Sequence, residues 1–161
     1  SDFVEMTNLV TVTFNMSIMG FILLGYVLIN GGQLNGPIVG SIIGAMSFGA
    51  FGNQVKNTVP VLVGIMIGCY LTGVDVASTS ALVATIFGTT LAPVSGYYGP
   101  IAGVIAGFVH ITLVSHVVVM HGGLNLYNNG FAGGFVAAVL VPIFEIFEGI
   151  RQEMKERKAE G

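Results

Sequence analysis

Long apolar runs separated by short polar stretches dominate this chain and predict its elements. A helix rises about 1.5 Å per residue and the hydrocarbon core of a bilayer is about 30 Å thick, so roughly 20 apolar residues can span it. Several runs approach that length, and the shorter ones are rich in glycine. We therefore predict an all-α integral membrane fold with about six transmembrane or re-entrant helices, over residues 9–29, 37–51, 59–72, 76–92, 100–120 and 131–147.

The distribution of charge supports a membrane protein. Only 8% of the residues are charged, whereas 53% are hydrophobic, and a soluble domain carries about a quarter charged residues. Between Met6 and Phe144 the only charged side chains are those of Lys56 and Asp75. We expect the surface to face the lipid bilayer, and the net charge of −3 gives no indication of nucleic-acid binding.

The same charges predict a domain division and an orientation. Residues 1–147 form one transmembrane domain, and residues 148–161 form a charged helical tail. An even number of crossings places both termini on one side. The loop with Lys56 falls on that side too, so that all five Lys and Arg residues share one face. The positive-inside rule then makes both termini cytoplasmic.

An internal repeat joins two distant segments. Residues 36–44, GPIVGSIIG, and residues 99–107, GPIAGVIAG, both read Gly-Pro-Ile-x-Gly-x-Ile-x-Gly. The offset of 63 residues crosses three predicted helices, which predicts two three-helix units of opposite orientation, 9–73 and 75–147. Inverted repeats of this kind are typical of transporters and channels. The alternative is that the glycines serve only close helix packing; they are Gly36, Gly40, Gly44, Gly99, Gly103 and Gly107.

Two amide-rich segments precede the third helix of each predicted unit. They are 51–58, FGNQVKNT, and 121–130, HGGLNLYNNG. Irregular backbone at membrane depth is tolerated where protein or water satisfies its polar groups. Both loops could therefore line the mouths of a polar pathway, or both could be turns in water. We favour a turn for 51–58 and leave both interpretations open for 121–130; the candidate residues are Asn53, Asn57, Asn125, Asn128 and Asn129.

Other polar residues inside apolar runs are further candidates. Asn15 corresponds to Ser78 by the repeat offset, and this pair could line a central path or join two helices by hydrogen bonds. His110 and His116 lie in one predicted span, on different faces, and a hydrogen-bonding role is favoured over a metal site because no acid or cysteine is near. Asp75 is expected to be a helix N-cap.

Nothing in the sequence indicates an enzyme. A nucleophile–base pair, a phosphate loop, a metalloprotease motif and a redox pair are all missing, and the lone Cys69 forms no disulfide framework. No cofactor or metal is expected.

The segments FGAFGNQVKNTVPVLVGIMIG and HGGLNLYNNGFAGGFVAAVLVPIFE resemble a bacterial multi-pass membrane family known only as a domain of unknown function. The resemblance implies the bacterial inner membrane and covers the chain as the C-terminal half of longer members. The glycine-rich plan is loosely similar to urea-transporter and aquaporin-type channels, which contain re-entrant half-helices. The Asn-Pro-Ala signature of aquaporins is absent, since 34–37 reads LNGP, so no substrate residues are carried over.

Two functions follow from these patterns. The preferred one is a channel or facilitator for a small polar solute or ion, with its pathway at the interface of the two inverted units. The near-absence of buried charge favours passive passage. The alternative is a non-transporting membrane scaffold or assembly subunit. The expected partners are lipid, the solute, and further copies in a dimer or trimer or a missing N-terminal half.

Overall fold

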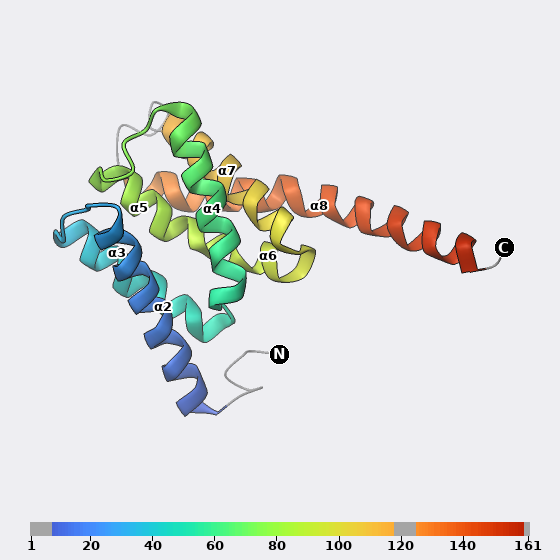
Figure 1. Ribbon diagram of the computed structural model, residues 1–161, viewed down its shortest axis with the longest axis horizontal. Helices are drawn as coiled ribbons and strands as arrows, with labels where there is room; N and C mark the ends of the chain where they lie inside the picture. Colours follow the sequence, from blue (N-terminus) through green and yellow to red (C-terminus); the bar gives the residue numbers. More distant parts are fainter. Residues whose placement is uncertain (1–7, 118–124, 160–161) are drawn as a thin grey trace.

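The computed structural model describes residues 8–117 and 125–159, and over these residues the protein is helical and contains no strand (Figure 1). This confirms the predicted all-α class. The elements are α2 (Leu9–Ile29), α3 (Gly36–Met46), η1 (Ser47–Phe51), α4 (Val55–Thr72), α5 (Thr79–Gly88), η2 (Thr89–Leu91), α6 (Ala92–Tyr98), α7 (Pro100–Val117) and α8 (Asn125–Ala159).

Five helical stretches of the described chain are long and apolar enough to cross a membrane. They are α2, α4, the combined stretch α5–η2–α6, α7, and α8 from Asn128 onward. An 18-residue helix such as α4 is about 27 Å long, close to the thickness of the hydrocarbon core. The stretch formed by α3 and η1, Gly36–Phe51, is shorter. The six predicted segments therefore correspond to five candidate spans and one shorter helix.

Polar side chains at the helix starts account for several element boundaries. Asn8 accepts a hydrogen bond from the Thr11 amide at 2.9 Å, and Asn35 accepts one from the Ile38 amide at 3.1 Å. Ser78 caps α5 by accepting from the Ala81 amide at 3.3 Å. Each cap satisfies a donor that the first helical turn leaves free.

Asp75 does not cap a helix, so that prediction is corrected. Its Oδ1 accepts from the Ala77 amide at 3.0 Å, as expected, but within the turn that precedes α5. The helix begins only at Thr79, because the Ser78 side chain takes the cap position. Asp75 is exposed.

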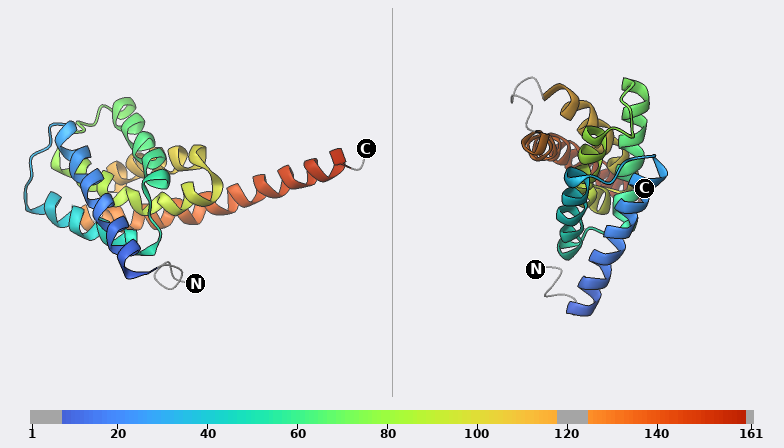
Figure 2. Two further views of the ribbon diagram at one scale, coloured as in Figure 1. Left: turned by 60° about the horizontal axis from the view of Figure 1, so that its bottom comes forward. Right: turned by 90° about the vertical axis from the view of Figure 1, so that its left-hand side faces the viewer.

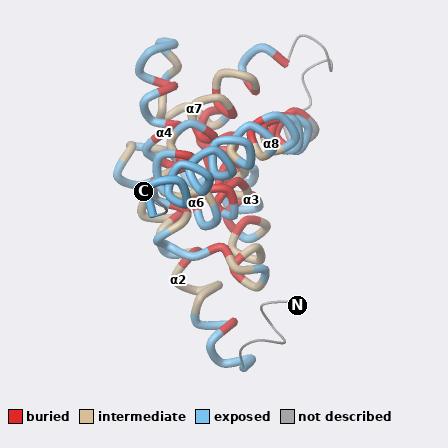
Figure 3. Tube along the Cα trace, turned by 90° about the vertical axis from the view of Figure 1, so that its right-hand side faces the viewer, coloured by how far each residue is buried: buried red, intermediate tan, exposed pale blue. Residues whose placement is uncertain are grey.

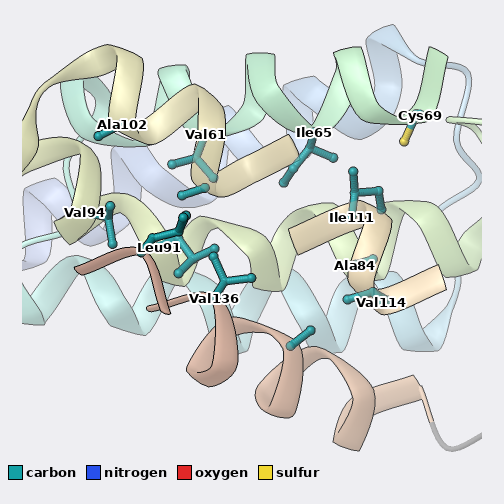
Figure 4. Packing of buried hydrophobic residues seen from close by; sticks show 13 residues of the cluster. Val61, Ile65, Cys69, Ala84, Leu91, Val94, Ala102, Ile111, Val114 and Val136 are labelled. Atoms are coloured by element: carbon teal, nitrogen blue, oxygen red, sulfur yellow. The ribbon is translucent and has the colours of Figure 1, made fainter. Parts of the chain in front are cut away.

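Helix α5 occupies the centre of the molecule, and two hydrophobic clusters meet on it. On one side Leu82, Val83 and Ile86 pack with residues of α2 and α3. On the other side Ala84 packs in a cluster that α4, α6, α7 and α8 complete (Figure 4). Seven of the ten residues of α5 are buried, whereas the tail of α8 is exposed throughout (Figure 3). A helix buried on all sides must be apolar all round, and its few polar groups need partners inside the protein.

Helices α4 and α7 run in parallel, with their backbones in contact through glycine. A Cβ added at Gly64 would collide with the Val104 carbonyl, and one added at Gly107 would collide with the Val61 carbonyl. A Cβ added at Gly103 would instead meet side chains, those of Pro60 in α4 and Ser95 in α6. Small residues at a helix interface permit this approach, and close packing holds helices together in lipid.

The glycine ladder predicted from the repeat is only partly used in this way. Gly103 and Gly107 lie in the α4–α7 contact, and so do Gly64 and Gly68 of α4, which form a ladder that the repeat comparison missed. Gly99 has φ +94 and ends α6 instead of lining a helix face. A Cβ at Gly36 or Gly40 would meet nothing within 4 Å. At Gly44 it would touch only the Phe87 ring, at 3.9–4.0 Å.

The predicted amide loop 121–130 is corrected over its second half. Helix α8 begins at Asn125 and continues for 35 residues through Pro142 into the charged tail, which projects from the rest of the protein (Figures 1 and 2). Residues 118–124, including His121, lie outside the described residues. Asn125, Asn128 and Asn129 therefore belong to the first turns of a helix.

Specific contacts define two ends of the helix bundle. At one end Asn15 of α2 bonds to the segment before α4, and Asn57 of α4 lies against Gly96 of α6. The Tyr98 hydroxyl at the end of α6 donates to Glu145 of α8 at 3.5 Å, near the start of the tail. At the other end Asn35, before α3, donates to the Thr79 hydroxyl at 2.8 Å.

Candidate polar site at the helix break

Buried polar side chains gather around the break between α5 and α6. The break interrupts what would be a single 20-residue span, and it lies at Thr89–Leu91. Buried polar groups are costly unless they are hydrogen-bonded, and lipid supplies no partners. Among the described residues, the buried polar residues of α4 to α8 and their connections are Asn53, Thr58, Thr85, Thr89, Ser95, His110, Asn128 and Asn129.

Pro93 explains why the helix breaks where it does. In a continuous α-helix the carbonyl of Thr89 would accept from the amide of residue 93, but proline has no N–H. The Thr89 carbonyl instead accepts from the Ala92 amide, as in a 3-10 turn. It also accepts from Nδ2 of Asn53 at 3.0 Å. Asn53 is only 3% exposed, so the predicted turn in water at 51–58 is corrected at this residue.

The side-chain amide of Asn15 lies next to Asn53 on this side of the break. Nδ2 of Asn15 donates to the carbonyl of Gly49 at 2.8 Å and to that of Asn53 at 2.7 Å. These bonds tie α2 to η1 and to the turn before α4. The predicted pairing of Asn15 with Ser78 is wrong, because Ser78 caps α5 at the opposite end of the bundle and donates to the Asp75 carbonyl at 2.7 Å.

His110 lies on the other side of α5, near the middle of α7. Its side chain is 0% exposed, and Nε2 is 3.2 Å from the carbonyl oxygen of Ala84. A carbonyl only accepts, so Nε2 carries the proton and donates. Gly88 makes room for the ring, because a Cβ there would be 2.9 Å from His110 Cδ2 and 2.6 Å from Ile65 Cδ1.

The first turns of α8 bring two asparagines to the same region. The side chain of Asn129 interacts with that of His110. Asn128 is 0% exposed, and within the part of the chain that the structure describes neither its Nδ2 nor its Oδ1 has a hydrogen-bond partner. It lies one turn before Ala132 and two turns before Val136, which pack into the central cluster. An amide can form up to four hydrogen bonds, and this one is buried without any.

A cavity of about 220 Å³ lies between α5 and α7. Ser80, Ser115 and Ala84 are among the residues that line it. The carbonyl of Ala84 is the one that accepts from His110. Ala84, Ile111 and Val114 line the cavity and also belong to the cluster that contains Ala132 and Val136. A larger groove of about 390 Å³ between α2 and α3 is lined almost entirely by apolar side chains, and it has no link to the polar residues.

Other predicted site residues lie elsewhere. His116 is exposed, with Nδ1 2.7 Å from the Thr112 carbonyl oxygen, so the two histidines of α7 do face different ways. Asn57 is half-buried and lies against Gly96. The sequence analysis did not predict the helix break at Thr89 or the space that Gly88 leaves for His110. Pro93, four residues after Thr89, indicates such a break.

No Asp, Glu, Lys or Arg is among the described residues that form the site. Lys56 and Asp75, the two charged residues in the long apolar stretch, are both exposed. Among the described residues no three His, Cys, Asp or Glu side chains group as metal ligands would. The site thus offers hydrogen-bond donors and acceptors from amides, hydroxyls, an imidazole and backbone carbonyls.

In a comparison with known families, residues 1–146 match a family described as "Protein of unknown function (DUF1576)". No curated protein and no solved structure matches the chain.

Proposed function

Because the chain belongs to the DUF1576 family, whose function is unknown, we propose a function from the site itself: a membrane channel or facilitator for a small polar solute. The pathway passes the break between α5 and α6, beside His110 and Asn128. The observation that carries this proposal is the Asn128 amide, which is fully buried with no partner in the described protein.

An unsatisfied buried polar group costs about 1–3 kcal/mol. A leucine of similar size at position 128 would avoid that cost. A polar group kept at such a position is therefore accounted for if water or a solute reaches it during function. Intramembrane polar residues that face the interior of a bundle commonly mark such pathways.

The interrupted helix supports the same proposal. Discontinuous helices expose backbone polar groups at membrane depth, and transporters use them to build solute sites. Here the break at Thr89 lies in the most buried of the candidate spans. The cavity between α5 and α7 would lead from Ser80 and Ser115 toward Ala84, and Asn53 with Asn15 would lie on the opposite side of the break.

The two inverted three-helix units remain part of the proposal. Each Gly-Pro motif opens a helix, α3 and α7 respectively. Both units also contain a short 3-10 segment, η1 and η2, with carbonyls satisfied by asparagine side chains. The plan is in this respect similar to channels of the urea-transporter and aquaporin type. The packing is not symmetric, since the close α4–α7 contact has no counterpart of similar size between α8 and α3.

We also propose the orientation and assembly. Lys56 in α4 and the basic residues of the tail belong to the end of the bundle where α6 meets α8. The positive-inside rule assigns that end to the cytoplasm, in a bacterial inner membrane. The exposed Gly36 and Gly40 leave a bare helix surface that fits a homo-oligomer.

Reconstitution in liposomes tests the function. Vesicle shrinkage after an osmotic jump would be measured with a panel of small neutral solutes, and ion flux with Na⁺, K⁺ and Cl⁻. We expect at least one solute to cross faster than in empty vesicles, and His110→Phe to reduce that rate at least fivefold. His116→Phe, on the same helix but exposed, serves as the matched control and should retain it.

The second function, a non-transporting scaffold, is favoured by one observation, the backbone contact between α4 and α7. Such packing holds helices together whether or not a solute passes. If no solute or ion crosses vesicles that contain correctly folded protein, the transport proposal is wrong and the scaffold remains.

A further inference from the structure

The chemistry around Asn128 also restricts what the site can bind. We infer that Asn128 forms the binding site for a small uncharged solute that presents a hydrogen-bond donor and an acceptor on one edge, as a carboxamide does. The inference rests on the proposed function, and it names the class of solute and the residue that holds it.

The first step is the exclusion of ions. An ion that leaves water for a buried site needs an opposite charge or a cage of ligands. The charged residue nearest to Asn128 in the sequence, Glu145 of α8, is exposed, and so are Lys56 and Asp75. The described residues group no ligands for a metal ion. The site therefore has nothing to compensate a full charge.

The second step is the pattern of donors and acceptors. Nδ2 of Asn128 offers two N–H donors and Oδ1 offers an acceptor, and both atoms are unpartnered. The two lie side by side in one planar amide. A solute that has only acceptors, or only donors, would leave one of them unsatisfied. A solute with a donor and an acceptor on one edge satisfies both at once, and desolvated polar groups make such discrimination strong.

The third step is size and access. The cavity between α5 and α7, about 220 Å³, is lined by Ala84, Ile111 and Val114. These residues share a hydrophobic cluster with Ala132 and Val136, which lie on the same face of α8 as Asn128. Asn128 does not itself line this cavity. Since one water occupies about 30 Å³ in the liquid, the cavity has room for a molecule of a few heavy atoms next to the cluster into which that face of α8 packs.

Equilibrium binding tests the inference directly. Thermal unfolding of the purified full chain in detergent would be followed in acetamide, in acetate, its charged isostere, and in acetone, which lacks the donor. We expect acetamide alone to raise the Tm in a saturable manner. The Asn128→Leu variant should lose that rise, whereas Gln33→Leu, at an exposed position, should keep it.

Flux provides the second readout. Acetamide entry into liposomes should fall at least tenfold in Asn128→Leu and also in Asn128→Asp, which keeps the shape but adds a charge. To separate an effect on binding from an effect on folding, both variants must match the wild type in size-exclusion profile before the rates are compared.

The outcomes separate the inference from the proposed function. If solutes cross but Asn128→Leu leaves both rate and Tm response unchanged, or if ions cross in preference to acetamide, the inference is wrong and transport stands. If nothing crosses but the acetamide response depends on Asn128, the binding site stands without transport. If acetamide, acetate and acetone act alike, the inference is overturned.

Discussion

Nδ2 of Asn53 donates to the carbonyl of Thr89 at 3.0 Å, where Pro93 withholds the backbone amide that would otherwise bond there. The Asn53 side chain thus adds a second donor, beside the Ala92 amide, to this carbonyl across 36 positions of sequence. The bond links the turn before α4 to the centre of the most buried span.

Removal of this amide should destabilise the protein. Asn53→Ala leaves the buried Thr89 carbonyl with a single donor, and a loss of about 1–3 kcal/mol is expected. Thermal unfolding in detergent would measure it, with the exposed neighbour Gln54→Ala as control. In a Pro93→Ala background residue 93 regains its N–H, so the cost of Asn53→Ala should fall below about 1 kcal/mol. An equal cost in both backgrounds would show that the Asn53 bond does not replace the proline amide.

The glycine contact between α4 and α7 should tolerate no side chain. Gly107→Ala puts a Cβ against the Val61 carbonyl, and backbone cannot move aside as a side chain can. We expect a loss of about 1–3 kcal/mol and a lower yield of folded protein. Gly40→Ala is the matched control, because a Cβ there meets nothing within 4 Å; it should be neutral or stabilise by up to about 1 kcal/mol. Equal losses in both variants would contradict the contact.

Gly88 should matter for the position of His110. An added Cβ would press on His110 Cδ2 and Ile65 Cδ1, at 2.9 and 2.6 Å. We expect Gly88→Ala to displace the ring from the Ala84 carbonyl and to lower solute flux severalfold. In a His110→Phe background, the addition of Gly88→Ala should lower the flux no further. Flux of the two single variants and the double variant measures this coupling. Losses that multiply would mean that Gly88 acts independently of His110.

Cysteine labelling checks the orientation. In a Cys69→Ala background, single cysteines at the exposed positions Gln54 and Gln152 should react from one side of the membrane, and one at Gln33 from the other. Inside-out and right-side-out vesicles with an impermeant maleimide distinguish the sides. Labelling of Gln54 and Gln33 positions from the same side would refute the even number of crossings. Wild-type Cys69 is buried and should stay unlabelled.

The sequence predicted the apolar helices well because lipid imposes a simple requirement of length and apolarity. It also placed the start of α7, where Gly99 and Pro100 punctuate the chain. It failed at 125–130, where an Asn-rich segment with Gly130 suggested a loop. Asparagine favours turns because its side chain competes for backbone hydrogen bonds, and glycine because a helix restricts its backbone. Here the packing of Ala132 and Val136 into the central cluster outweighs these preferences.

The site was harder to predict, because its members meet only in three dimensions. His110 and Asn128 were both candidates, but no spacing indicated that α8 would bring Asn129 to His110. The bonds from Asn15 to Gly49 and Asn53 replaced the pairing that the repeat offset implied. The break at Thr89 could have been found from Pro93, and the Gly64–Gly68 ladder from its own spacing.

The shared backbone surface of α4 and α7 also limits how the protein can move. Where two helix backbones touch without intervening side chains, no change of rotamer can accommodate sliding of one helix along the other. The two helices must therefore move together as one rigid unit. Any opening of the interior therefore requires movement of the elements around this rigid pair, which are α2 and α3 on one side and the first turns of α8 on the other.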